Sequence, residues 1–393
     1  MKRIRRERFV GLALAALLLV AGCRSEPEPG VGPEPGADVQ TLRVGHVGHD
    51  HHLSLYLAAL EGERFKKDFG IHLKEVKLKE VYDLVDGGET LARLRLIKVG
   101  GGSRMPAAMS RGEIDVGLGG VTAVVKFADQ GQPFRILAPL NTDGDMLVMQ
   151  KDSPITDWPA FVKAAKEGEK PLRIGYKAPV AVAKLVFERA LVAEGISYGY
   201  DRTEGDTGVI LVNFGSEKSP IPLMESKAID GFVMNQPGVA VAEHKGLGKM
   251  IAELRDLPPE GKWVNHPCCC VCATDDTIKA HPAALKGLLK VILLATQLIN
   301  TEQDLAVDCA SRWTKHEKAV EQASVPTNTY IAEPSESWVT AMKTWAEMVK
   351  DVKLFTGKYA DVTPDAFADD ALDLTLVREA ARDLRKKGLL ETP

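Results

Sequence analysis

The sequence predicts an α/β protein of two similar lobes, followed by a mostly helical C-terminal part. Three observations favour this class. From Thr41 onward, short apolar runs alternate with segments of helical periodicity, which is typical of α/β folds. The same order restarts near Leu172, and the octapeptide RGEIDVGL at 111–118 is echoed by SKAIDGFV at 226–233. From His281 onward the periodicity is mostly helical. Two α/β lobes leave a cleft at the C-terminal ends of their strands, where small ligands bind.

The first lobe begins with a predicted strand at 42–47 and a helix that starts near Leu53. Ser103 is placed to cap a short helix. The pattern continues with a strand at 114–118, a helix at 121–130 and a strand at 134–138.

The second lobe begins with a predicted strand at 172–176. Pro179 suits the first position of the helix that follows, and another strand is expected at 209–213. The C-terminal part contains an amphipathic helix that starts at His281-Pro282 and further helices at 338–355 and 375–387. We therefore expect residues 41–143 and 274–393 to form one lobe with the C-terminal helices, and residues 144–273 to form the other.

The first 22 residues are typical of a secretory signal peptide. A basic segment at 2–8 precedes an apolar run at 10–21, which is too short to span a membrane. The run ends in VAGC at 20–23, which resembles the bacterial lipobox, where the cysteine is lipidated and the signal is removed before it. An ordinary signal peptide or membrane anchor with a chance cysteine is the alternative. Residues 24–40 are rich in Pro, Gly and Glu, so we expect residues 23–40 to be a lipidated Cys23 and an extended tether.

The charge of the chain excludes two classes of partner. The formal net charge is −4, and residues 1–22 contribute five basic residues and one acidic residue, so the remaining chain carries −8. A protein this acidic has no electrostatic footprint for nucleic acid or for anionic lipid. We expect contact with the membrane through the lipid anchor only.

Five residues of the first strand-to-helix turn combine imidazole and carboxylate groups. The string HVGHDHH at 46–52 contains His46, His49, Asp50, His51 and His52. Imidazole and carboxylate at short spacing can bind zinc or a similar ion, but these neighbours need a distant fourth ligand for a tetrahedral site. We favour the interpretation that one or two of these side chains hydrogen-bond a polar ligand while the others meet solvent, because first turns line the ligand cleft in this architecture.

The string CCCVC at 268–272 is the most unusual in the chain. In a regular strand Cys268, Cys270 and Cys272 share one face and Cys269 lies on the other. We favour a buried strand in which cysteine acts as a small hydrophobic residue. A soft-metal or redox site formed by Cys268, Cys270 and Cys272 is the alternative, although the string lacks a C-x-x-C pair.

Further polar groups follow predicted strands and are candidates for the ligand cleft. The Gly-rich turn before Ser103 can present backbone N–H groups to an anion or can form a simple tight turn. In the second lobe, Lys177, Asn235 and Gln236 end strands, where they either face the cleft or lie in exposed loops. The remaining candidates, Gly120 and Thr122, lie where a strand passes into a helix. No G-x-S-x-G, G-x-x-x-x-G-K, H-E-x-x-H or dinucleotide-binding motif is present in the sequence.

Over residues 41–350 the sequence resembles the solute-binding proteins of nitrate, sulfonate and taurine type ABC importers. It is most similar to the branch of thiamine-pyrimidine-precursor binding proteins and the related fungal pyrimidine synthase. The resemblance rests on the lipobox, on the first-turn histidine followed by LYLA at 55–58, on GEIDVG at 112–117, on IDG at 229–231, and on the Cys-rich string before His281-Pro282. His52 matches the histidine of the N-x-x-H turn in the precursor-binding proteins, and CCCVC is similar to the CCCFC string of the fungal enzyme. The resemblance implies a type II periplasmic binding protein fold of two doubly wound lobes.

At two positions the sequence differs from that of the synthase, and this difference favours a binding protein over an enzyme. The synthase uses a Lys that holds pyridoxal phosphate and a His four residues later, and this chain has Gly119 and Ala123 at those positions. Neither side chain can form a Schiff base, so we expect no enzyme and no cofactor. The resemblance implies a monomeric lipoprotein, outside the cytoplasm, that captures a small solute by hinge closure and delivers it to ABC permease subunits. A pyrimidine-synthesising enzyme and a metal-binding lipoprotein are the alternatives. The identity of the solute does not follow from the sequence.

Overall fold

The computed structural model describes residues 39–200, 207–216 and 218–391. These residues belong to one unit of the chain, Pro35–Pro393. The predicted signal peptide, Cys23 and the tether up to residue 38 lie outside the described residues.

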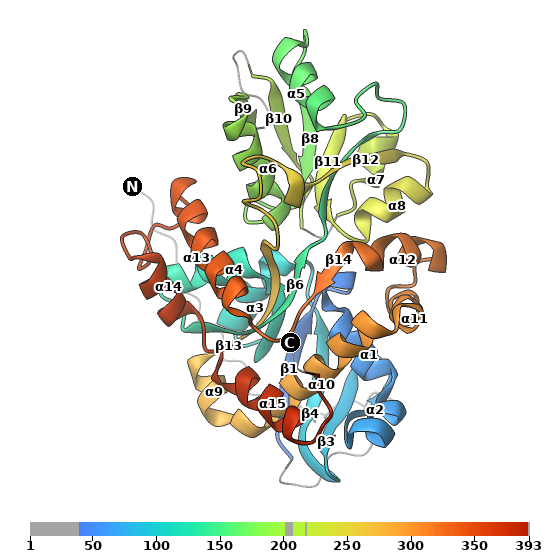
Figure 1. Ribbon diagram of the computed structural model, residues 1–393, viewed down its shortest axis with the longest axis vertical. Coiled ribbons are helices and arrows are strands. Elements are labelled where there is room, and N and C mark those ends of the chain that lie inside the picture. The colour runs from blue at the N-terminus through green and yellow to red at the C-terminus, as the bar shows by residue number, and fades with distance from the viewer. Residues whose placement is uncertain (1–38, 201–206, 217, 392–393) are drawn as a thin grey trace, which may run out of the picture. The chain divides into compact units, whose positions relative to one another are not determined.

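An eight-stranded mixed sheet forms the first lobe, in the order β14-β6-β13-β5-β1-β4-β3-β2 (Figure 1). β1 pairs in parallel with β4 and β5, whereas β13 runs antiparallel between β5 and β6. The strands are β1 Thr41–His46, β2 Ile71–Lys77, β3 Val81–Asp86, β4 Glu89–Lys98, β5 Val116–Gly120, β6 Phe134–Asp143, β13 Pro267–Thr274 and β14 Asn328–Tyr330. The sequence did not predict the antiparallel run β2–β4.

A six-stranded sheet forms the second lobe, in the order β12-β7-β11-β8-β10-β9. Its centre is parallel, and β7 joins it antiparallel to β11 and β12. The strands are β7 Asp145–Gln150, β8 Leu172–Tyr176, β9 Tyr198–Tyr200, β10 Val209–Asn213, β11 Gly231–Asn235 and β12 Gly248–Glu253. Its helices are α5 Trp158–Glu167, α6 Val182–Ala193, α7 Ile221–Glu225 and α8 Gly238–His244. The two sheets with flanking helices confirm the predicted α/β class.

The remaining helices come from the N-terminal and C-terminal parts of the chain, and most of them pack on the first sheet or on one another. They are α1 Leu53–Leu60, α2 Gly62–Phe69, α3 Met105–Ser110, α4 Val121–Asp129, α9 Asp275–Ala280, α10 Pro282–Thr301, α11 Gln303–Thr314, α12 Lys318–Ser324, α13 Glu336–Asp351, α14 Pro364–Ala371 and α15 Thr375–Lys386. Among the described helices α10 alone is long and apolar enough to cross a membrane, but it is mostly buried and packs against α1 and α15. We interpret it as a core helix.

Two crossing segments connect the sheets. β6 and β7 belong to different sheets and are separated by Gly144, whose φ is +79°. The chain returns through the 3₁₀ turn η3 Leu254–Asp256 and the loop that ends at His266. β13 is therefore a strand of the first lobe, and the return crossing precedes Pro267 rather than following Ala273 as the sequence suggested. The first helix of the second lobe also differs, because α6 begins at Val182 and not at Pro179.

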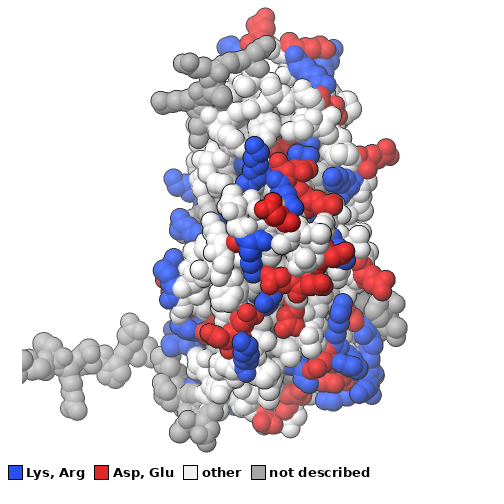
Figure 2. All heavy atoms as spheres, turned by 90° about the vertical axis from the view of Figure 1, so that its left-hand side faces the viewer, with Lys and Arg blue, Asp and Glu red and all other residues white. Residues whose placement is uncertain are grey.

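The surface in Figure 2 carries charges of both signs. On this face Lys and Arg side chains are interspersed with Asp and Glu side chains. This mixture provides no broad basic patch on the face shown, and such a patch is what a nucleic-acid-binding face requires.

Candidate functional site

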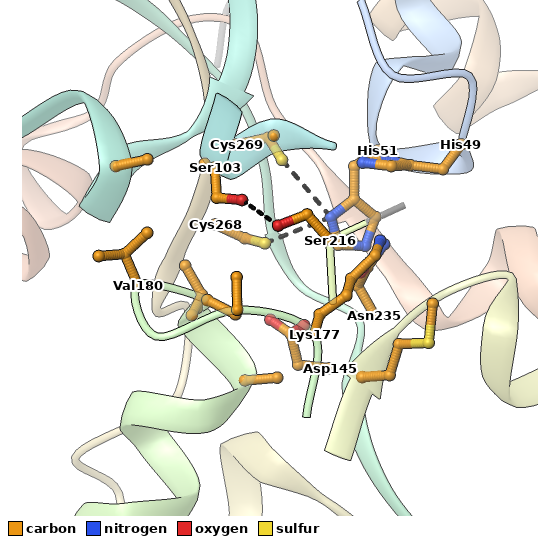
Figure 3. Close-up of a pocket in the computed structure, with 18 of the residues that line it drawn as sticks. His49, His51, Ser103, Asp145, Lys177, Val180, Ser216, Asn235, Cys268 and Cys269 are labelled. Carbon is orange, nitrogen blue, oxygen red and sulfur yellow. Dashed lines mark hydrogen bonds between the residues drawn. The ribbon is translucent and has the colours of Figure 1, made fainter. Parts of the chain in front are cut away.

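A cavity lies between the ends of strands from both sheets, and we call it the inner pocket (Figure 3). It contains about 600 Å³ of space between atoms, part of which is open to solvent. The 3₁₀ turns η1 Asp50–His52 and η2 Gly102–Arg104 approach it from the first lobe, and the loop before α6 approaches it from the second. The loop contributes mainly Ala and Val side chains, so one wall is apolar.

Six of the residues predicted to bind the ligand line the inner pocket. They are His49, His51, Ser103, Gly120, Lys177 and Asn235. Lys177 Nζ donates to Asn235 Oδ1 at 3.3 Å, and both come from the second lobe. The hydroxyls of Ser103 and Ser216 lie 2.6 Å apart and connect the two lobes directly. The rule that strand ends meet at one cleft therefore brings these groups together.

The other four predicted residues, Asp50, His52, Thr122 and Gln236, do not line the pocket. Asp50 accepts a hydrogen bond from Ser324, and burial followed by the nearby Glu321 raises its pKa well above the usual range. Thr122 accepts from Trp345 Nε1 at 3.1 Å, and Gln236 donates to Thr327 Oγ1 at 3.2 Å. The Nδ1 atom of His52 accepts from the Val47 amide at 3.3 Å. These side chains stabilise the surroundings of the pocket.

The histidine turn and the cysteine strand meet at the inner pocket. His51 Nδ1 lies 3.2 Å from Cys268 Sγ and 3.7 Å from Cys269 Sγ (Figure 3). Adjacent cysteines reach the same imidazole because the register of β13 against β6 shifts between Cys269 and Cys270. A bulge of this kind breaks the alternation of a regular strand.

Cys270 and Cys272 lie on the other side of this irregularity. Their thiols donate to the carbonyls of Gly119 and Gly117 in β5, and they are buried in the core of the first lobe. The metal set Cys268, Cys270 and Cys272 that alternation suggested is therefore not assembled. All five cysteines in the described part of the chain are free thiols.

Two histidine nitrogens at the pocket lack a partner. His49 Nδ1 and His51 Nε2 are buried and make no hydrogen bond to any described residue. Burial, followed by the neighbouring His52 and Lys177, lowers the pKa of His49 well below its usual range, so its ring is neutral. Buried polar atoms are normally hydrogen-bonded, so these nitrogens point to a partner supplied by a ligand or an ion.

The thiols beside these histidines have unequal acidities. The contact between the two thiols raises the pKa of Cys268 and lowers that of Cys269. Burial opposes the lowering at Cys269, whereas the His51 and His52 imidazoles add to it. The ligand atoms of His51, Cys268 and Cys269 all lie within 4.8 Å of one another, as do those of His49, His52 and Cys269. Imidazole and thiolate in this arrangement are suitable for a transition-metal ion such as zinc.

An ionic cluster supports the pocket at the crossing segments. His266 Nε2 lies 3.2 Å from Asp145 Oδ2, and Nδ1 lies 3.3 Å from Asp143 Oδ1. Burial lowers the pKa of His266, but the hydrogen bonds to Asp143 and Asp145 outweigh it and raise the pKa to about 9. Arg255 also pairs with Asp143, at 3.1 Å. Because Asp145 lines the inner pocket, this cluster connects the pocket to both crossings.

Several lining residues were not predicted from the sequence as ligand residues. Ser216 follows β10, so the strand-end rule that identified Asn235 was sufficient to find it. Asp145 and the pair Cys268 and Cys269 gave no such signal. Their positions depend on the crossing at Gly144 and on the irregular register of β13.

Comparison with known proteins places this geometry in a family. The model of the NMT1-like family matches residues 36–313. The chain belongs to the NMT1-like family. An uncharacterised protein of Methanocaldococcus jannaschii is 33% identical over 144 residues, which cover 36% of this chain and 94% of the relative.

Solved structures show the same fold at low sequence identity. The zinc-bound ligand-binding component of an ABC-type import system from Staphylococcus aureus is similar with a TM-score of 0.66 and 16% identity, covering 87% of this chain and 99% of that one. The periplasmic nitrate-binding protein NrtA of Synechocystis PCC 6803 gives 0.65 and 16%, covering 90% and 92%. The Candida albicans CA3427 gene product, described as having the generic periplasmic binding protein fold, gives 0.60 and 14%, covering 86% and 97%. The chain therefore has the periplasmic binding protein fold, as the resemblance in sequence implied.

Proposed function

We propose that the protein is the solute-binding component of an ABC importer and captures a small polar or anionic solute in the inner pocket. The observation that carries the proposal is the set of polar groups which both lobes present to one cavity. His49, His51 and Ser103 line it from the first lobe, and Lys177 and Asn235 line it from the second. The fold shared with a ligand-binding component of an ABC-type import system and with a periplasmic nitrate-binding protein supports the same role.

Capture would proceed by closure of the lobes about the two crossing segments. Ser103 and Ser216 already bridge the lobes at 2.6 Å, and Gly144 lies at the centre of the first crossing. A solute that bonds to groups of both lobes favours the closed state over the open one, because it has more contacts there. The closed protein would then deliver the solute to the permease subunits at the membrane.

We propose a binding role rather than catalysis. At Gly119 a Cβ atom would lie 3.2 Å from Met105 Cβ and 3.3 Å from the Gly102 carbonyl, so the position has no room for a lysine without rearrangement. Ala123, at the start of α4, has no group that takes part in proton transfer. Nothing at these two positions replaces the Lys and His of the synthase.

Native mass spectrometry of freshly purified protein tests the proposal. We expect one small-molecule adduct on the wild type and on Gln132→Ala, a surface variant near the far end of β6. The adduct should be depleted in Asn235→Ala, because a lost partner in a buried site costs about 1–3 kcal/mol. Equal occupancy in Asn235→Ala and the wild type would place the solute elsewhere.

A second candidate function is binding of a transition-metal ion. It is favoured by the convergence of His51, Cys268 and Cys269 on one point beside the pocket. We expect untagged protein to bind one zinc ion, measured by elemental analysis after dialysis. Cys269→Ala should lose the ion, whereas Cys270→Ala, which removes a neighbouring buried thiol outside the cluster, should keep it. Loss of zinc in both variants or in neither contradicts a site at His51, Cys268 and Cys269.

A further inference from the structure

A second hollow lies next to the inner pocket, and we call it the outer groove. It contains about 1290 Å³ of space between atoms and open solvent, and it shares His49, Lys177, Ser216 and Met234 with the inner pocket. The two hollows are therefore adjacent, with these four residues at their common border. The two spaces are best considered as one site with two different ends.

The described lining of the outer groove is basic, although the chain as a whole has a negative net charge. Three lysines line it, Lys98, Lys177 and Lys218, and none of the described residues in its lining is Asp or Glu. No described carboxylate forms an ion pair with any of the three, although the chain as a whole carries a net charge of −4. His316 adds an imidazole whose Nδ1 contacts Glu321 at 3.1 Å.

The three lysines come from both lobes. Lys98 ends β4 in the first lobe and lies over the histidine turn, where a Cβ at Gly48 would be 3.2 Å from its Cε. Lys177 follows β8 and Lys218 precedes α7, both in the second lobe. Closure brings like charges together across the groove, which is unfavourable unless an anion lies between them.

The inner end of the site is chemically different. Ala and Val residues of the loop before α6, with Val233 and Met234, form an apolar part of its lining, and the rest includes the polar side chains described above and the Asp145 carboxylate. Such a surface suits an apolar or ring-shaped group with one or two hydrogen-bonding atoms. A ligand complementary to both ends has an organic part and a highly charged end.

We propose that the solute is an organic dianion, whose organic part enters the inner pocket and whose doubly charged end binds Lys98, Lys177 and Lys218 in the outer groove. The inference rests on the proposed function and names its ligand class. Two negative charges on one end match three ammonium groups better than one does, because charge-assisted hydrogen bonds are the strongest that the groove can offer. A phosphomonoester and a malonate-type dicarboxylate share this chemistry.

Titration calorimetry at pH 8 with four phenyl compounds tests the proposal. Phenyl phosphate and phenylmalonate end in a dianion, benzenesulfonate in a monoanion, and benzyl alcohol is neutral. We expect at least one dianion to bind roughly ten-fold more tightly than benzenesulfonate, and the comparison of the two dianions identifies the source. Lys98→Gln and Lys218→Gln should each reduce this preference, whereas Lys67→Gln, an exposed lysine of α2, should preserve it.

Three results would overturn the proposal. The first is binding of benzenesulfonate as tight as that of both dianions, and the second is no measurable binding of either dianion. The third is a preference for dianions that persists in the Lys98→Gln, Lys218→Gln double variant. If the native adduct is lost in Asn235→Ala while the dianion preference is absent, the proposed function stands and the dianion inference alone is rejected.

Discussion

His51 and His52 are adjacent in the sequence, yet their side chains contact different groups. The 3₁₀ turn has three residues per turn, so neighbouring side chains leave it in different directions. His51 lines the inner pocket, whereas His52 accepts a hydrogen bond from the Val47 backbone. The two residues therefore offer a matched test of what the turn does.

We predict that His51→Ala weakens binding of the co-purified solute roughly 5- to 150-fold, as expected for the loss of a buried partner worth about 1–3 kcal/mol. The unfolding midpoint of the ligand-free protein should change less than in His52→Ala, which leaves the Val47 amide without its acceptor. Calorimetry with the isolated solute and thermal unfolding measure the two effects. Full affinity in His51→Ala would exclude this imidazole from the site.

The sequence predicted the location of this turn but not the direction of each side chain. The location of the turn follows from the hydrophobic pattern, which shows where the strand ends and where the next helix begins. Direction depends on the turn type and on tertiary contacts, such as that of Asp50 with Ser324 of α12. The sequence pattern also predicts a regular strand for the cysteine string, because it does not show tertiary contacts. In the structure a register shift turns Cys268 and Cys269 toward His51.

At the scale of elements, the two crossing segments combine a glycine with a buried ionic cluster. Asp143 and Asp145 flank Gly144 on the first crossing, and His266 ends the second. The Asp143 amide also donates to the His266 carbonyl at 3.3 Å, so backbone and side chains hold the crossings together. Changes at these positions should affect both stability and lobe closure.

We predict that the stabilisation by His266 depends on pH. Its pKa is raised to about 9 in the folded protein, from an ordinary value of 6.5. A raised pKa means that the charged ring stabilises the fold fully below about pH 6.5 and that this contribution is lost as pH rises through about 9. The contribution is of the order of 3 kcal/mol. The difference in unfolding free energy between wild type and His266→Gln should therefore shrink between pH 6.5 and 9, and a constant difference would show that the ring is not charged.

We predict that Gly144→Ala is more destabilising than Gly246→Ala. Both glycines have a positive φ, of +79° and +66°, so both replacements cost about 1 kcal/mol or more in backbone strain. At Gly144 a Cβ would also meet Asn328 Oδ1 and approach His51 Nε2 to 3.0 Å, whereas nothing lies within 4 Å at Gly246. Chemical denaturation measures the difference. Equal losses in the two variants would show that the crossing tolerates a side chain.

The sequence predicts the bounds of those strands and helices whose hydrophobic pattern is contained within the element itself. The strands β8 and β10 have the predicted bounds, and the helices α10 and α15 start where expected. The antiparallel run β2–β4 and the membership of β13 in the first sheet were missed, because strand pairing is decided by contacts distant in the sequence. Ser103 and Ser216, which meet across the cleft, are 113 positions apart.

At the scale of the whole molecule, the predicted lipid anchor is consistent with the transport role proposed for the folded part of the chain. A binding protein with a lipid anchor meets a permease in the same membrane more often than one that diffuses freely, because anchoring raises its effective concentration. The proposed lipid anchor on Cys23 therefore suits the proposed transport role.

We predict that Cys23 carries the anchor and that the preceding 22 residues are removed. Cells labelled with radioactive palmitate should incorporate label into the wild type and into Ser25→Ala, a neighbouring variant that leaves the VAGC string intact. Cys23→Ser should incorporate none, because a hydroxyl does not replace the thiol that forms the thioether to the diacylglycerol. The intact mass of the wild type should match the chain from Cys23 onward plus lipid. Palmitate incorporation into Cys23→Ser at the wild-type level would contradict lipidation at Cys23. An intact mass that includes residues 1–22 would contradict removal of the signal peptide.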